Sequence, residues 1–96
     1  MSARTFTLLD GVTANTTGAT TNLLLARNKH IVQVIAADSP NASCLIEGSL
    51  DGSNWNTLAT KTGGEVFEVL GVPYIRARVT GYVAGTWTVL LQQGVS

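Results

Sequence analysis

Short runs in which apolar and polar residues alternate constrain this chain more than any other feature of its sequence. The run Tyr74–Thr80 has an apolar residue at every second position, and the run Trp87–Leu91 repeats the pattern. A period of two places alternate side chains on opposite faces of a β-strand, whereas a helix needs a period near 3.6. The pattern therefore predicts half-buried strands.

Clusters of turn-forming residues separate these runs at intervals of about 8–12 residues, which is typical of sandwiches and small barrels. The clearest clusters are Asp38–Asn41, Asp51–Asn54 and Lys61–Gly64. The β-branched run Ile31–Ile35 argues against a helix, because such side chains lose χ1 freedom there. We therefore predict an all-β chain of about seven or eight strands, folded as an antiparallel β-sandwich with a jelly-roll topology.

The order of the runs suggests which strands pair. We expect His30–Ala37 to form a hairpin with Ser43–Ser49, and Tyr74–Thr80 to form another with Trp87–Leu91. The polar segment Val12–Thr21 is interpreted as a loop or a weak edge strand. Residues 1–96 are too few for two cores, so we predict one domain, in which residues 1–6 form either an N-terminal arm or a frayed terminus.

Charge and hydropathy argue against several classes of partner. Six basic and six acidic side chains cancel, and charged residues make up only 12% of the chain. Neutralising phosphates requires an excess of Lys and Arg, so we expect no nucleic-acid partner. No run approaches the roughly 18 apolar residues of a membrane span, and we expect no membrane partner. The segment Met1–Thr7 lacks the apolar core of a signal peptide, which favours a chain made and kept in a cytosol.

The sequence offers little for catalysis or metal binding. Cys44 and His30 are the only residues of their types, which excludes an intrachain disulfide and a multi-histidine zinc site. The segment Asp51–Asn56 carries oxygen ligands for calcium but lacks the further carboxylates of an EF-hand loop, so we interpret it as a tight turn. No nucleophile elbow or phosphate-binding loop is present. We expect no cofactor and no enzymatic activity.

Alternation also leaves apolar side chains without a place in the core. Ile31, Ile35, Leu45 and Leu90 cannot all share a core face with their strand neighbours. Either both faces of a sheet are covered, or an apolar patch meets another subunit. Together with the zero net charge and low charge density, this pattern favours self-association.

Two surface interpretations remain open. Arg76 and Arg78 would project side by side with Tyr74, either as a partner contact or as a solvated face with cross-strand pairs to glutamate. The glutamates weighed for those pairs are Glu47, Glu65 and Glu68. Trp55, Tyr74 and Tyr82 near turns would suit a platform for sugar stacking. Trp87 shares the alternation face of Val89 and Leu91 and is expected in the core.

Three segments carry a family resemblance: Glu47–Trp55, Pro73–Gly81 and Gly85–Leu91. They resemble small β-sandwich structural proteins from the virions of tailed bacteriophages, over about the C-terminal half of the chain. The resemblance implies a capsid decoration, or cement, protein that binds the assembled shell as a homo-oligomer, with a trimer favoured. It implies the major capsid protein or other virion proteins as partners, the outer capsid surface as location, and synthesis in the host cytoplasm.

No catalytic or ligand residue follows from this resemblance. The interface candidates are Arg4, Phe6, Tyr74, Arg76 and Arg78. The alternatives are a carbohydrate- or receptor-binding module of the virion and a structural part of the tail or connector.

Overall fold

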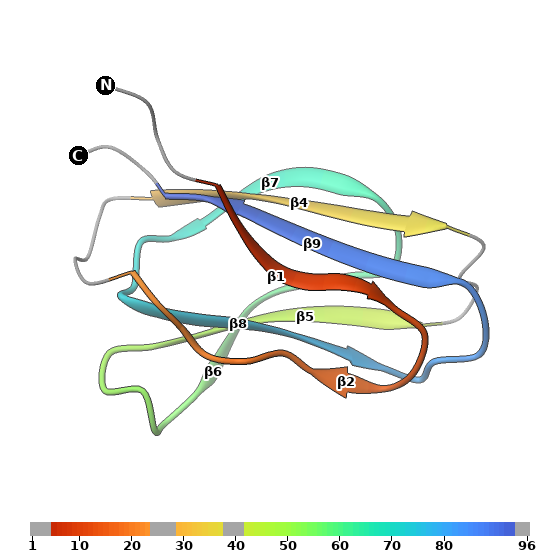
Figure 1. Cartoon of the computed structure of the whole chain (residues 1–96). Helices are drawn as coiled ribbons and strands as arrows, with labels where there is room; N and C mark the ends of the chain where they lie inside the picture. Colours follow the sequence, from red (N-terminus) through yellow and green to blue (C-terminus); the bar gives the residue numbers. More distant parts are fainter. Residues whose placement is uncertain (1–4, 24–28, 38–41, 94–96) are drawn as a thin grey trace.

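The computed structural model describes residues 5–23, 29–37 and 42–93. These residues form nine β-strands, which Figure 1 labels in chain order. The strands are β1 (Thr5–Val12), β2 (Thr16–Thr17), β3 (Thr21–Asn22), β4 (Lys29–Ala37), β5 (Ser43–Ser49), β6 (Asn56–Lys61), β7 (Glu65–Leu70), β8 (Tyr74–Thr80) and β9 (Thr86–Gln92).

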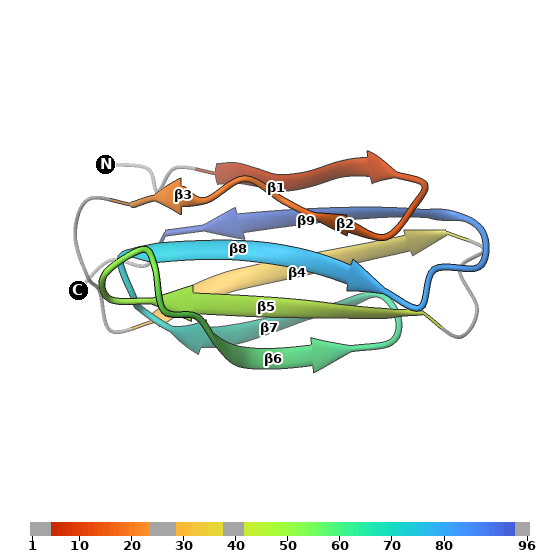
Figure 2. The same ribbon diagram turned by 90° about the horizontal axis from the view of Figure 1, so that it is seen from below.

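The strands form two antiparallel sheets that pack face to face, as Figures 1 and 2 show from two directions. One sheet has the order β1-β9-β4-β7, and the other has the order β2-β8-β5-β6, with β3 also paired to β8. When β2 and β3 are counted as one interrupted strand, this is the strand order of an eight-stranded jelly roll. The predicted fold is confirmed, and the count of nine comes from that interruption.

Gly18 lies at the interruption between β2 and β3. Its N–H donates to the carbonyl of Ala77 at 2.8 Å. A Cβ on Gly18 would lie 2.6 Å from the carbonyl oxygen of Leu8 and 3.0 Å from Cδ2 of Leu9. Only glycine therefore fits where this segment passes against β1. The segment corresponds to the weak-edge-strand alternative of the sequence prediction.

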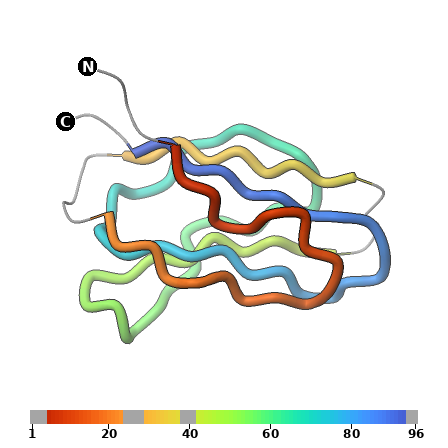
Figure 3. The backbone as a smooth tube through the Cα atoms, viewed as in Figure 1, coloured from red at the N-terminus to blue at the C-terminus, as the bar shows by residue number. Residues whose placement is uncertain are grey.

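Both predicted hairpins are wrong. β4 pairs with β7 and β9, whereas β5 pairs with β6 and β8, so the first expected pair is split between the sheets. β8 and β9 are split in the same way. Figure 3 shows the chain crossing from one sheet to the other between β8 and β9. Alternation predicts which face of a strand is buried. It does not predict whether the following turn leads to a strand of the same sheet or crosses the roughly 10 Å to the other sheet.

The core lies between the sheets and follows the alternation. On β8, the apolar side chains of Ile75, Ala77 and Val79 are almost completely buried, and Trp87 is completely buried on β9, as expected. Leu8 and Leu9 are both buried although they are adjacent, because the register between β1 and β9 shifts between Thr7 and Leu9. The full set of buried apolar residues is Leu8, Leu9, Leu23, Val32, Val34, Ala42, Cys44, Ile46, Val69, Ile75, Ala77, Val79, Trp87, Val89 and Leu91.

Candidate interaction surfaces

Three of the predicted interface residues lie together on the outer surface of the β2-β8-β5-β6 sheet. Tyr74, Arg76 and Arg78 are the half-buried positions of β8, and they alternate with its core positions. Register with β5 places Glu47 directly opposite Arg76. We call the surface formed by Glu47, Trp55, Tyr74, Arg76 and Arg78 the arginine face.

Glu47 joins the two arginines of the arginine face. Nε of Arg76 lies 2.7 Å from Oε1 of Glu47, and one terminal guanidinium nitrogen of Arg78 lies 3.4 Å from Oε2. The Glu47 side chain is only 8% exposed, because the two guanidinium groups and the sheet cover it. Of the three glutamates considered from the sequence, only this one pairs with the arginines. One carboxylate against two guanidinium groups leaves an excess of one positive charge.

Trp55 completes the arginine face. The guanidinium carbon of Arg76 lies 4.2 Å from the centroid of the Trp55 ring, a cation–π contact. The ring therefore presents one of its sides to Arg76. Trp87 is fully buried, as its place in the alternation predicts. The hydroxyl of Tyr82 donates to the carbonyl of Gly85 at 2.7 Å.

The two remaining interface candidates have different outcomes. Arg4 lies outside the described residues. Phe6 is half-buried, packs against the core and pairs with Leu91 of β9, while Thr5 pairs with Gln92. Thr5 and Phe6 therefore belong to the sandwich rather than to an N-terminal arm.

The opposite broad side of the molecule is the outer surface of the β1-β9-β4-β7 sheet. It carries Ile31 and Ile35 of β4, each 43% exposed, and Val66 of β7, which is 60% exposed. Register places Leu90 and Thr88 of β9 beside these residues. The apolar residues that alternation excluded from the core therefore gather here, apart from Leu45, which is opposite Arg78 on the other sheet.

Charged side chains on this surface lie at one end of β4 and along the β7 edge, where Glu68 is opposite Ile31. β9 contains no charged residue, and the only one on β4 is Lys29 at its first position. Lys29 forms an exposed ion pair with Glu68 of β7 at 3.3 Å. A shallow hollow of about 290 Å³ lies between Thr5, Ile31, Gln33, Val66 and Leu90. We call the surface formed by Ile31, Gln33, Ile35, Val66, Thr88 and Leu90 the neutral face.

The Asp51 carboxylate organises the turn between β5 and β6. Oδ1 of Asp51 accepts the backbone N–H groups of Ser53 and Asn54, each at 2.8 Å, and Oδ2 accepts the Asn54 side-chain amide at 2.7 Å. These donors hold the pKa of Asp51 far below its usual range, with the Asn54 N–H the largest contribution. Gly52 has a φ of 78°. The carboxylate is thus occupied as the organiser of a tight turn.

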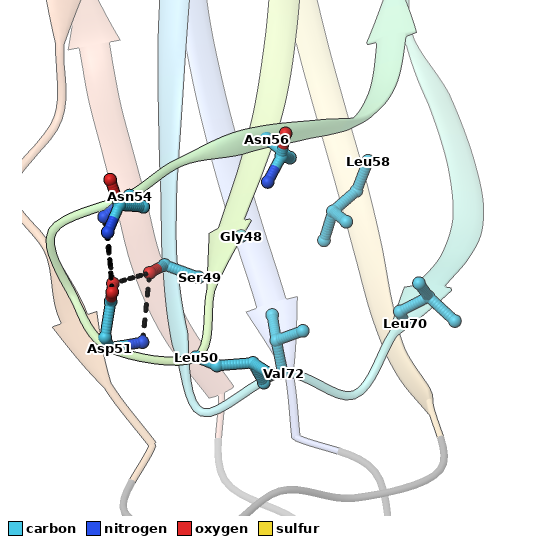
Figure 4. Close-up of a pocket in the computed structure, with 9 residues that line it drawn as sticks. All are labelled: Gly48, Ser49, Leu50, Asp51, Asn54, Asn56, Leu58, Leu70 and Val72. Atoms are coloured by element: carbon cyan, nitrogen blue, oxygen red, sulfur yellow. Dashed lines mark hydrogen bonds between the residues drawn. The ribbon is translucent and has the colours of Figure 1, made fainter.

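Beside this turn lies a second hollow of about 360 Å³, shown in Figure 4. Leu58 and Val72 line its apolar side, and Asn54 and Asn56 line its polar side. A Cβ on Gly48 would lie 2.6 Å from Cγ2 of Val72, so a side chain there would displace this lining. The shape and chemistry would suit an aliphatic side chain of a partner. Sequence analysis did not find this hollow.

The structure describes the surroundings of both single-copy residues, Cys44 and His30. Cys44 is buried, and burial raises the pKa of its thiol from 9.0 to about 11, which keeps it protonated at neutral pH. His30 is buried, and its Nε2 lies 3.0 Å from the carbonyl oxygen of Val72. Within the described ranges, no three His, Cys, Asp or Glu side chains group as metal ligands, and no helix is long and apolar enough to cross a membrane.

Comparison with known proteins adds no relative: no family model, curated protein or solved structure matches this chain. Interpretation of its function therefore depends on the fold and on the two broad faces described above.

Proposed function

We propose that this chain is a non-enzymatic structural protein of a tailed-bacteriophage virion, a capsid decoration protein that binds the assembled shell as a homo-oligomer. In this proposal the chain is made in the host cytoplasm and ends on the outer capsid surface, against the major capsid protein or other virion proteins. A trimer remains the favoured stoichiometry from the family resemblance.

The observation that carries this proposal is the presence of two different contact surfaces on opposite sides of one small sandwich. A decoration protein needs one surface for other copies of itself and another for the shell. The neutral face offers exposed isoleucine and valine side chains, and the arginine face offers an unbalanced positive charge. Exposed apolar side chains such as those of the neutral face promote association.

The resemblance residues support the same proposal through their positions. Glu47 and Trp55, from the first resembling segment, contact Arg76 from the second. The first two resembling segments thus meet in the arginine face. A carboxylate-bearing surface of the shell would match its excess charge, and matched charges fix register and orientation in a protein interface.

Binding of this kind stabilises a shell by mass action. A ligand that binds the assembled state and not the dissociated one adds RT ln(1 + [L]/Kd) of stability per site, about 2.7 kcal/mol at a free concentration of 100 Kd. Catalysis is not required, because the contribution comes only from the difference in affinity between the two states.

Arg78→Gln tests the role of the arginine face. The variant removes the excess charge, while Arg76 keeps its 2.7 Å contact to Glu47. We expect binding to emptied heads of the encoding phage, measured by co-sedimentation, to weaken at least about 10-fold, as for loss of one matched interface charge. Lys61→Gln is the control, because it removes one positive charge from a side chain that pairs with Glu65 and belongs to neither face. Equal shell binding by wild type and Arg78→Gln would contradict the proposal.

The double charge reversal Arg76→Glu with Arg78→Glu is a less specific test of the arginine face than Arg78→Gln. From sequence alone, it is expected to weaken assembly without affecting the monomer fold. The nearly buried Glu47 carboxylate lies against both positions, so the reversal would gather three carboxylates and destabilise the monomer itself.

A further inference from the structure

The proposed contact of the arginine face with the shell does not involve the neutral face, whose exposed apolar side chains would still lack a partner. Its two central strands, β9 and β4, present threonine, glutamine, leucine and isoleucine outward. In β4, the outward positions Ile31 and Ile35 are 43% exposed, while the intervening inward positions Val32 and Val34 are almost completely buried. Isoleucine at two exposed positions of one strand is unusual on a solvated sheet face, where polar residues alternate outward.

Charge identifies the kind of partner that fits this face. Lys29 and Glu68 at the border of the neutral face pair with each other, so two copies of this face meet without net charge repulsion, and the chain as a whole has zero net charge. The arginine face behaves oppositely, because two copies of it would oppose four guanidinium groups with only two carboxylates. Self-association is therefore favoured on the neutral face and disfavoured on the arginine face.

The area is sufficient for a specific contact. The molecule is a slab with extents of 37, 29 and 17 Å, and the outer surface of the β1-β9-β4-β7 sheet lies on one broad side. A rectangle of 37 by 29 Å covers about 1,070 Å², and a standard protein interface takes about 800 Å² from each partner. Three quarters of that side would provide such a contact.

We propose that a second copy of this chain covers the neutral face, with Ile31, Ile35 and Val66 at the centre of the contact. This inference rests on the proposed function, in which copies associate before or upon binding the shell. It assigns the copy-to-copy contact to the β1-β9-β4-β7 sheet, and this contact leaves the arginine face of each copy, on the opposite broad side, uncovered.

The double variant Ile35→Lys with Val66→Lys tests this assignment. Both side chains are exposed, so the monomer fold should persist, whereas burial of unpaired ammonium groups opposes the contact. Light scattering and sedimentation equilibrium of the purified chain over a concentration series should show an oligomer for wild type. For the variant, we expect the dissociation constant to rise at least about 100-fold.

The matched control is Leu50→Lys with Val83→Lys, which adds the same charge at apolar residues that are 78% and 63% exposed outside the neutral face. It should retain the wild-type mass. If the test variant fails to fold by circular dichroism, Gln33→Lys at the middle of the face replaces it. A wild-type chain that stays monomeric at its highest soluble concentration, or test variants with the wild-type mass, would overturn the inference.

These mass measurements use the purified chain without capsids, so they test the contact between copies independently of the proposed function. Oligomers that depend on the neutral face but do not bind heads would overturn the decoration role and support this contact. Wild-type chains that bind heads while the face variants keep their mass would support the decoration role and overturn this contact.

Discussion

Glu47 is expected to stabilise the monomer more than any exposed charge in the described part of the chain. Its side chain is 8% exposed, and those of Arg76 and Arg78 are 25% and 38% exposed. Glu47→Gln keeps the size of the side chain and its capacity for hydrogen bonds, but it leaves two guanidinium groups facing each other without a counter-charge.

The size of the effect follows from this partial burial. Removing one partner of a fully buried ion pair costs roughly 3–5 kcal/mol, whereas exposed pairs contribute about 0–1 kcal/mol. Because solvent reaches both arginines, we expect Glu47→Gln to lower the free energy of unfolding by about 2 kcal/mol. For a domain of this length, that loss corresponds to a fall in Tm of about 8–16 °C.

Thermal unfolding followed by circular dichroism at low and high salt measures this fall. Glu68→Gln is the matched control, since it breaks the pair with Lys29 in which the side chains are 61% and 64% exposed. We expect the control to shift Tm by less than about 8 °C. Equal shifts for the two variants would refute the reasoning that burial of Glu47 makes its ion pairs matter.

Two further predictions concern the fold. Gly18→Ala should lower the free energy of unfolding in urea by about 1–3 kcal/mol, because the added Cβ would lie 2.6 Å from a backbone oxygen. The control Gly63→Ala should be neutral or slightly stabilising, because its Cβ would have no atom within 4 Å. Equal effects of the two variants would contradict the close approach of Gly18 to β1. Burial raises the pKa of Cys44 to about 11, so the thiol of the unfolded chain ionises at a lower pH than that of the folded chain. The contribution of the protonated thiol to the free energy of unfolding is therefore complete below pH 9.0 and is lost as the pH rises through about 11. The loss should reach about 2–3 kcal/mol relative to Cys44→Ala, measured as the difference between their pH profiles, and parallel profiles would show that the thiol ionises equally in both states.

The sequence predicted the class of fold and the inward residues because both follow from alternation. The runs around Ile75 and Val89 have a period of two, and the apolar residues at their alternate, inward positions are buried. Pairing was not predictable in the same way, because Gly81–Gly85 joins strands of different sheets although the same residues would also suit a hairpin turn. In this jelly roll, the strand order depends on contacts between segments far apart in the chain.

The surfaces were predictable only in part. Alternation placed Arg76 and Arg78 on one face, but three glutamates were candidates for their partner, and register alone selects Glu47. The excess apolar residues signalled the neutral face, although not which strands would share it. The hollow beside the β5–β6 turn depends on Leu58 and Val72 meeting across a gap left by Gly48, a juxtaposition with no signal in local sequence.

The most direct test of the decoration role compares binding to two states of the same capsid protein. The purified chain is mixed with emptied phage heads or with dissociated capsid subunits, and bound chain is quantified by sedimentation and light scattering. The account predicts saturable binding to heads, negligible binding to subunits, and heads that withstand higher temperature when the chain is bound. A monomer that binds neither state, or one that binds subunits as tightly as heads, would contradict it.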